Sequence, residues 1–378
     1  MTVSARDTYD DKVVIPSIRQ AIQRDFFVPD DSVIALQPAS PHVHHECPDL
    51  DLSSYTKVII CMSGGKDSIA SMLRIIESGY PVEQMELWHH LVDGSPSEPV
   101  FADWSFMHDY CEQLSAAFNI PLYSSWLEEG FKGEMLKENS KPKPHTFETP
   151  DGFVTLGRDR AKPGTRRLFP QQKADLRQRW CSGALKIDVG RRALNNQARF
   201  YGHRTLFVTG ERRSESPLRS RLDQLTPHLS DTARNKNPIK PRYIDSYKNV
   251  LHLSEEEVWE TLERWRIVPP VPYRLHFSRS SCMICIFNSD KVFATMMEYW
   301  PERLREIAYY EKEFGKSIAR SGKRVDERAL LAKPFELDDI EALEQSLKRK
   351  YELPIFVPDG QTWKLPPGAF SIEKSGAV

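Results

Sequence analysis

Short apolar runs alternate with amphipathic stretches over much of the chain. The first run, residues 57–62, is rich in β-branched residues and ends at a Gly-Gly pair, which is typical of a buried strand. Residues 68–78 then carry apolar side chains at helical spacing and stop at Gly79, a residue type that often follows a helix C-terminus. A strand followed directly by a helix predicts the βα unit of an α/β protein.

The same alternation continues further along the chain. Additional strands are predicted at 85–92, 121–127 and 205–209, and additional helices at 104–118, at 185–198 and from Ser254, where Glu257 completes a capping box. Strands that alternate with helices form parallel sheets with helices on both faces. The sequence therefore predicts an α/β fold with a doubly wound, mostly parallel sheet.

Three segments do not follow this alternation of strands and helices, and they mark the boundaries of the predicted domains. Residues 1–56 form an N-terminal lead-in, with helical spacing only over 15–24. Residues 128–180 form a basic, partly irregular insertion within a domain that spans 57–289. Residues 290–378 are charged and predict a helical C-terminal region with Pro-rich turns near the end.

Composition and charge narrow the classes of function. The chain has 378 residues, 40% of them hydrophobic, and a net charge of −1, so any attraction to nucleic acid must come from local clustering of charge. We find no apolar run long enough to predict a membrane span, and the polar N-terminus lacks the pattern of a secretory signal. Six cysteines in a chain of this length do not form a disulfide framework. We therefore expect a cytoplasmic protein with reduced thiols.

The segment between the first strand and the first helix, residues 63–68, reads SGGKDS. Two glycines let the backbone turn so that its N–H groups face an anion, and the helix start adds partial positive charge there. The hydroxyls of Ser63 and Ser68 can donate hydrogen bonds. Lys66 can pair with phosphate oxygens, and Asp67 can hold Mg²⁺ or orient the loop. The plain alternative is a Gly-Gly turn before a helix.

The spacing of this loop differs from that of a Walker A loop. The segment instead resembles the SGGxDS signature of the PP-loop ATP pyrophosphatases, whose fold is of the adenine nucleotide alpha hydrolase type. The resemblance implies that the loop binds the β- and γ-phosphates of ATP with Mg²⁺, and that cleavage yields AMP and pyrophosphate. Such cleavage needs positioning and charge neutralisation rather than a covalent protein nucleophile.

Three later segments resemble the phosphoadenosine phosphosulfate reductase-like branch of this superfamily, in the order found there. They are CSGALK at 181–186, GERRSESPLR at 210–219 and SCMIC at 281–285, and the likeness spans about residues 57–315. It implies catalytic roles for Lys66, Asp67, Arg212 and Arg219. The implied nucleotide-binding residues are Ser63, Gly64, Gly65, Lys66, Asp67, Ser68, Gly210, Arg213, Glu215 and Ser216. Arginines in such a turn grip phosphate bidentately, and a solvated basic turn is the alternative.

Three cysteines are candidates for a metal centre. Cys282 and Cys285 have C-x-x-C spacing, and the resemblance places Cys181 at the start of a helix near the nucleotide site. Three thiolates suit a [4Fe–4S] cluster, as in sulfur-transfer relatives, or Zn²⁺ with one more ligand. Reduced structural thiols are the plain alternative. Cys61, in the first strand, and Cys111, on a helix, are expected to pack in the core.

Two further observations limit the chemistry. The cluster of His42, His44, His45 and Cys47 has a spacing that matches no helix or finger pattern, so we expect no metal there. True phosphoadenylylsulfate reductases use a catalytic cysteine near the C-terminus, whereas here no cysteine follows Cys285. Reduction of a sulfonucleotide through such a thiol is therefore not expected.

Positive charge gathers in residues 158–192. This segment contains eleven Lys or Arg and three Asp, which gives a local net charge of +8, and Phe169 and Trp180 lie among them. DNA or RNA fits such a segment, and a solvated flexible loop is the alternative.

Taken together, the resemblance is closest to the ATP pyrophosphatases of DNA phosphorothioation, of the DndC/SspD type. It implies adenylation of a DNA backbone oxygen for replacement by sulfur, linked to anti-phage defence. The implied partners are DNA, a cysteine desulfurase and other modification subunits, with no membrane. The alternatives are thiolation of tRNA or a small substrate, a sulfonucleotide reductase-like enzyme, and a non-catalytic nucleotide-binding subunit.

Overall fold

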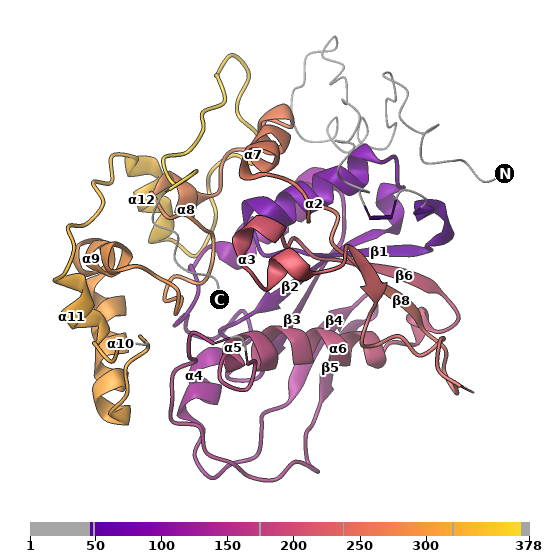
Figure 1. The fold of residues 1–378 in the computed structure, drawn as a ribbon, viewed down its shortest axis with the longest axis horizontal. Helices are drawn as coiled ribbons and strands as arrows, with labels where there is room; N and C mark the ends of the chain where they lie inside the picture. Colours follow the sequence, from indigo (N-terminus) through magenta and orange to yellow (C-terminus); the bar gives the residue numbers. More distant parts are fainter. Residues whose placement is uncertain (1–45, 48–49, 174, 237, 320, 372–378) are drawn as a thin grey trace.

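The structure is a computed structural model that describes residues 46–47, 50–173, 175–236, 238–319 and 321–371 (Figure 1). The helix expected at 15–24 and the cluster of His42, His44 and His45 lie outside the described residues. No helix within the described ranges is long and apolar enough to cross a membrane.

An eight-stranded sheet forms the centre of the described part of the chain, in the order β5-β4-β3-β2-β1-β6-β8-β7. The strands are β1 (Lys57–Cys61), β2 (Met85–Leu91), β3 (Leu122–Leu127), β4 (His145–Thr149), β5 (Gly152–Leu156), β6 (Arg204–Val208), β7 (Leu225–Pro227) and β8 (Tyr243–Tyr247). The five strands from β3 through β2, β1 and β6 to β8 run parallel. The hairpin β4–β5 and the short β7 join antiparallel at the two edges.

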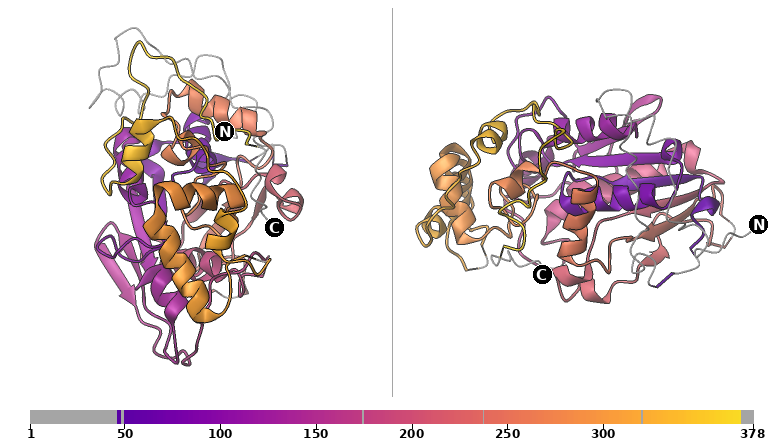
Figure 2. Two further views of the ribbon diagram at one scale, coloured as in Figure 1. Left: turned by 90° about the vertical axis from the view of Figure 1, so that its left-hand side faces the viewer. Right: turned by 90° about the horizontal axis from the view of Figure 1, so that it is seen from above.

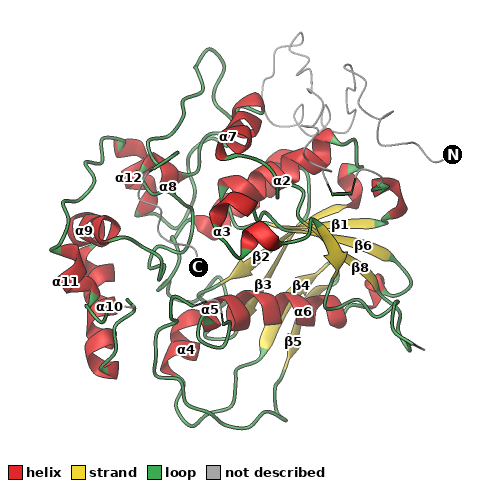
Figure 3. Ribbon diagram, viewed as in Figure 1, coloured by secondary structure: helices red, strands yellow, loops and turns green. Residues whose placement is uncertain are grey.

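Helices cover both faces of this sheet (Figures 1 and 3). One face carries α2 (Lys66–Glu77), α3 (Met107–Phe118) and α7 (Glu255–Arg264), and the other carries α6 (Asp188–Asn195), preceded by α5 (Trp180–Ser182). A second, smaller core that includes Trp88, Phe200 and Phe207 lies between the sheet and α6. The predicted doubly wound, mostly parallel α/β fold is confirmed. The capping box at the start of α7 is confirmed too, because Ser254 accepts from the Glu257 amide and Glu257 accepts from that of Ser254.

The segment 128–180 is more regular than its sequence indicates. It contains α4 (Gly130–Leu136) and the hairpin β4–β5, which extends the sheet by two strands. Its polar and charged residues conceal the alternation of the strands, because β5 lies at an exposed edge where outward positions need not be apolar. Strands β7 and β8 were likewise not foreseen from the sequence.

A helical C-terminal region packs at one end of the sheet, as Figure 2 shows. Its helices are α9 (Asp290–Tyr299), α10 (Pro301–Phe314), α11 (Val325–Ala329) and α12 (Ile340–Ser346), preceded by the short α8 (Val271–Arg274). The chain then returns to α3, where the Tyr351 amide donates to Asp109 at 2.7 Å and the Tyr351 ring lies 4.7 Å from that of Tyr110. The C-terminal region is thereby fixed to the helix that follows β2.

A buried carboxylate joins the end of α2 to α7. Glu77 Oε1 accepts from Arg264 Nη2 at 2.6 Å and from the Trp265 indole at 2.9 Å, and Oε2 accepts from Arg74 Nη1 at 3.1 Å. The Glu77 side chain is 0% exposed, so its charge is compensated entirely by these groups. This network holds α2 in place, and α2 begins at the predicted phosphate loop.

We expect Glu77→Gln to lower the free energy of unfolding by about 3 kcal/mol, because two guanidinium groups then lose the charge that compensates them. Urea denaturation measures the change, with Glu83→Gln on the exposed surface as the control. Equal stabilities of the two variants would contradict the assigned role of Glu77.

Candidate active site at the carboxyl edge of the sheet

The SGGKDS loop connects β1 to α2 at the carboxyl end of a central strand, where α/β sheets bind ligands. The Ser68 hydroxyl closes the loop: it accepts from the Ser63 amide at 3.3 Å and donates to the Gly65 carbonyl at 2.8 Å. Gly64 has φ +72°, a left-handed conformation that side chains disfavour. A Cβ on Gly64 would also lie 2.3 Å from Met107 Sδ. The loop is therefore preformed and packed against α3.

The loop offers backbone donors to an anion. Within the described part of the chain, no group accepts a hydrogen bond from the amides of Gly64 and Gly65. Both lie at the N-terminus of α2, where the helix dipole favours negative charge. These features suit a phosphate chain.

Lys66 is enclosed by protein in this arrangement. Its ammonium lies 3.2 Å from Asp67 Oδ2 and 3.6 Å from Glu255 Oε1, and 5.3 Å from the ring centroid of Tyr273. Burial alone would lower the pKa of Lys66, but the Asp67 carboxylate raises it above its usual value, so the ammonium stays charged. A contact between Lys66 and a bound phosphate would require the side chain to leave Glu255.

The segment 210–219 packs directly onto the loop. A Cβ on Gly210 would lie 2.9 Å from the backbone carbonyl of Asp67, so only glycine fits there. Arg212 Nε then donates to Asp67 Oδ1 at 2.6 Å. Burial would raise the pKa of Asp67, but Lys66 and Arg212 hold it below its usual value. The structure thus brings Lys66, Asp67, Gly210 and Arg212 together, as the sequence predicts.

Arg219 and Arg213 diverge from one another. Arg219 pairs with Glu215 and lies within electrostatic reach of Asp67, while its amide donates to Ser216 Oγ at 3.3 Å. Arg213 turns away from the loop and pairs with Glu46 and with the Ser220 carbonyl. Of the two, only Arg219 is near the loop.

Two further arginines, Arg279 and Arg179, are near enough for their charges to act on Arg219, and they were not singled out from the sequence. Burial lowers the pKa of Arg219, the Glu211 carboxylate opposes this, and the like charges of Arg279 and Arg179 lower the pKa further. Several guanidinium groups within electrostatic range of one another would suit a multiply charged anion. Glu211, also near Arg219, keeps one buried carboxylate oxygen, Oε2, without a hydrogen-bond partner in the described residues. Arg179 lies in the irregular part of segment 128–180. The orientation of its side chain could not be predicted from the sequence, because an irregular segment has no periodic pattern.

The three candidate metal ligands gather around Lys186. A π-helical turn, Gly183–Ile187, carries this lysine, and π turns often occur at functional sites. The surrounding protein disfavours the ammonium, yet its pKa is raised because Cys282, Asp103, Cys181 and Cys285 lie nearby. Within the described ranges no three His, Cys, Asp or Glu side chains are arranged so that they could hold a metal ion. The three thiols lie near Lys186, but in the described structure they do not form a metal-binding group. Cys111, by contrast, is fully buried in the core.

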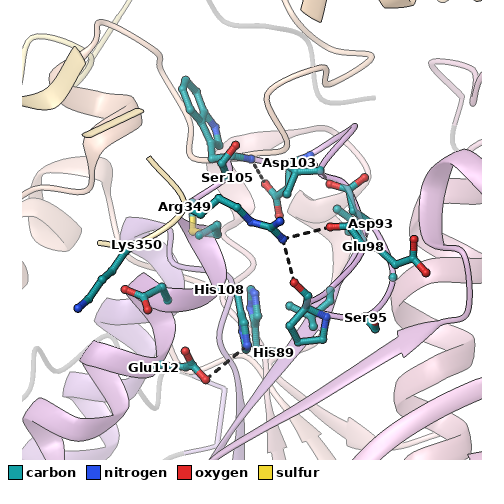
Figure 4. Close-up of a pocket in the computed structure, with 18 residues that line it drawn as sticks. His89, Asp93, Ser95, Glu98, Asp103, Ser105, His108, Glu112, Arg349 and Lys350 are labelled. Atoms are coloured by element: carbon teal, nitrogen blue, oxygen red, sulfur yellow. Dashed lines mark hydrogen bonds and ion pairs between the residues drawn. The ribbon is translucent and has the colours of Figure 1, made fainter. Parts of the chain in front are cut away.

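A cavity of about 350 Å³ opens at the end of β2 (Figure 4). Met107, which contacts Gly64, is in its wall, as are His89 and His108, whose rings stack at 5.8 Å. Burial lowers the pKa of His89 to about 3, and its Nδ1 donates to the Met62 carbonyl at 2.8 Å. The neutral ring therefore keeps Nε2 as a hydrogen-bond acceptor.

The outer wall of the cavity is a loop held by charged groups. Asp93 accepts from the amides of Ala102 and Asp103 at 2.7 and 2.9 Å, and Arg349 donates to the carbonyls of Pro96 and Glu98. No motif in the sequence marks these residues. The one indication in the sequence that they belong to a site is their position directly after a predicted strand, because the carboxyl ends of parallel strands share one edge of the sheet.

Comparisons with known proteins identify no family. No protein-family profile matches the chain. It is 24% identical over 275 residues to an uncharacterised 37.8 kDa protein of Escherichia phage 186, covering 67% of this chain and 74% of that protein. Among solved structures, Candida glabrata FMN adenylyltransferase with FMN and the ATP analogue AMPCPP has a TM-score of 0.34 and 14% identity, over 73% of this chain and 71% of that one. The same enzyme with FAD and inorganic pyrophosphate has a TM-score of 0.34 and 14% identity, over 73% and 69%. These likenesses are too distant to assign an activity.

Asp103 should make stability depend on pH. Burial and the neighbouring Asp93 carboxylate raise the pKa of Asp103 to about 6, from 3.8. Because the folded state disfavours the ionised form, stability falls as pH rises from about 4 to about 6 and stays lower above that range. We expect Asp103→Asn to recover about 2–3 kcal/mol at pH 8 and little at pH 4, on the basis of ~1.4 kcal/mol per pKa unit.

Thermal and urea unfolding of the wild type and Asp103→Asn at both pH values measure this effect. Asp359→Asn, on the exposed surface, is the matched control. A variant whose stability relative to wild type is the same at pH 4 and pH 8 would show that Asp103 has an ordinary pKa.

Proposed function

We propose that the protein is a PP-loop ATP pyrophosphatase that cleaves ATP between the α- and β-phosphates and thereby activates a substrate by adenylation for sulfur incorporation. The observation that carries the proposal is the convergence of unengaged loop amides at 64 and 65 with a group of arginines on one edge of the sheet. A triphosphate carries several negative charges, and this edge offers matching positive charge from three separate segments.

The phosphates would be bound by backbone and guanidinium groups. The amides of Gly64 and Gly65 would donate to the β- and γ-phosphates, and Arg219 would neutralise charge that develops on departing pyrophosphate. One or two carboxylates of the chain would hold Mg²⁺, which would supply further neutralisation of phosphate charge when bound. Asp67 is already engaged by Lys66 and Arg212, so Glu211, which has a free oxygen, is the better-placed carboxylate for Mg²⁺.

The nucleoside would occupy the cavity at the end of β2. The cavity adjoins the loop through Met107 and His89, so phosphates on the loop would direct the adenosine into it. Its stacked imidazole rings offer a flat surface to a purine base. The neutral His89 offers an acceptor for an amino group, which suits adenine.

The acceptor would meet the activated nucleotide next to the three cysteines. Lys186 lies among them and also close to Cys61, at the end of β1, so the thiols and the phosphate loop face the same edge. A DNA backbone oxygen is the acceptor that the basic segment favours, with a cysteine desulfurase as sulfur source. Thiolation of tRNA is the alternative, and it would use the same activation chemistry.

The products of ATP cleavage test the proposal. Incubation with Mg-ATP, with and without DNA, should give AMP and pyrophosphate, and Arg219→Ala should slow their release about 100-fold, the usual effect of removing one donor to developing charge. The exposed Arg221, two residues away, gives the matched control Arg221→Ala, which should act as wild type. ADP and phosphate as products would refute the proposed cleavage. Nucleotide binding without turnover would indicate a non-catalytic subunit.

The three thiols provide a separate test of the proposed cofactor. A [4Fe–4S] cluster would require the three thiols to move together from their described positions, and anaerobically purified protein that contains iron and shows the broad visible absorbance of such a cluster, both lost in Cys282→Ser, would show that they do so. Zinc in place of iron would identify a Cys-based zinc site instead. A colourless protein free of both metals would leave Cys181, Cys282 and Cys285 as plain thiols.

A further inference from the structure

The structure divides the basic segment 158–192 into neutralised and unneutralised parts. Arg166 pairs with Glu134 at 2.7 Å, Arg167 with Glu313 at 2.7 Å, and Arg177 with Asp175 at 2.8 Å. Arg166 and Arg167 link segments that are distant in the sequence, whereas Arg177 pairs with an acid two residues away. Their charge is compensated locally, and they add little attraction for a polyanion.

Arg158, Arg160 and Arg192 are different. They line an open cavity of about 430 Å³ together with Gly157, Asp159 and Ala161. Across the described residues no carboxylate forms an ion pair with any of these three arginines. Arg192 Nη2 donates to the Gly157 carbonyl at 3.1 Å, which holds it beside Arg158, and the Lys141 ammonium donates to the Asp159 carbonyl at 2.7 Å. Asp159 is the one acid in the cavity wall.

A buried histidine lies next to this cavity. His145, on β4, is 1% exposed, and neither of its ring nitrogens has a partner in the described residues. Burial, with a further contribution from the charges of Arg158 and Arg192, lowers its pKa to about 3, so it adds no positive charge of its own. Arg158 and Arg192 thus share one cavity wall without an ion-paired carboxylate in the described residues, which is an arrangement that suits an anion.

The position of the cavity relates it to the candidate active site. Strand β5 runs in the direction of β3, because both pair antiparallel to β4, so Gly157 and Arg158 emerge at the same edge of the sheet as the SGGKDS loop. Four strand spacings separate β5 from β1, roughly 19 Å. A chain of phosphates lying along this edge could reach both places, whereas a single small anion could not.

We propose that Arg158 and Arg192, with Arg160 at the rim, form a docking site for the sugar–phosphate backbone of a nucleic acid at the β5 edge. The open cavity, exposed Arg160 and nearby Lys162 suit an extended polyanion better than an enclosed small ligand. The inference rests on the proposed function only in that the bound strand would be the acceptor. Binding itself requires no ATP.

Fluorescence anisotropy with a labelled single-stranded DNA, without nucleotide and over a series of salt concentrations, tests the site. We expect the double variant Arg158→Ala/Arg192→Ala to bind at least tenfold more weakly, with a salt slope shallower by about 1 to 2, because two phosphate contacts are lost. The Lys variants at the same positions should retain most of the affinity. Arg177→Ala/Arg305→Ala removes two exposed, ion-paired arginines and should bind as wild type.

Equal weakening in both Ala double variants would overturn the proposal, because net charge alone would then explain it. So would a wild type that binds inorganic phosphate at this edge but no DNA. Thermal unfolding confirms that each variant is folded. Pyrophosphate release from Mg-ATP without DNA should be unchanged by Arg158→Ala/Arg192→Ala. If the wild type releases none but DNA binding responds as expected, the docking site stands and the proposed function fails.

Discussion

The site depends on one close contact between two backbone segments. Gly210, after β6, lies against the carbonyl of Asp67 at the start of α2, at a distance that admits no side chain. This contact places Arg212 on Asp67 and directs the chain so that Arg219 follows at the same edge. Motifs more than 140 residues apart in the sequence thereby form one surface, since β1 and β6 are adjacent parallel strands. The buried Glu77 network fixes the far end of α2 and so holds the loop in register.

Charge is distributed unevenly over a protein that is nearly neutral overall. The carboxyl edge of the sheet gathers Arg179, Arg212, Arg219 and Arg279 around the loop, and Arg158 with Arg192 further along. Elsewhere, arginines of the same basic segment are matched by acids. Arg212 and Arg219 each have a carboxylate partner, Asp67 and Glu215, whereas Arg158 and Arg192 have no ion-pair partner in the described residues. Arginines gathered at one edge would suit a negatively charged ligand, which is the basis of the proposed ATP site and of the proposed docking site for a nucleic acid.

Much of the fold could be predicted from the sequence, and less of the site. Strands β1 and β6 have apolar runs because most of their residues are buried, β2 and β3 are mostly buried but carry more polar residues, and helix α7 has a capping box. Strands β4, β5 and β8 were not predicted, because their edge positions and polar residues conceal the alternation of apolar and polar side chains on which strand prediction depends. The loop was recognisable because its chemistry is contiguous. The cavity around His89, the roles of Arg179 and Arg279, and the outward turn of Arg213 depend on how distant segments pack, which a local pattern does not contain.

The most direct test of the account is a crystal structure with Mg²⁺ and an ATP analogue that has a methylene bridge between the α- and β-phosphates. We expect β- and γ-phosphate oxygens within hydrogen-bond distance of the amides of Gly64 and Gly65, with the base in the cavity beside His89. An analogue bound elsewhere, with residues 63–68 in contact with no phosphate, would rule out the proposed nucleotide site.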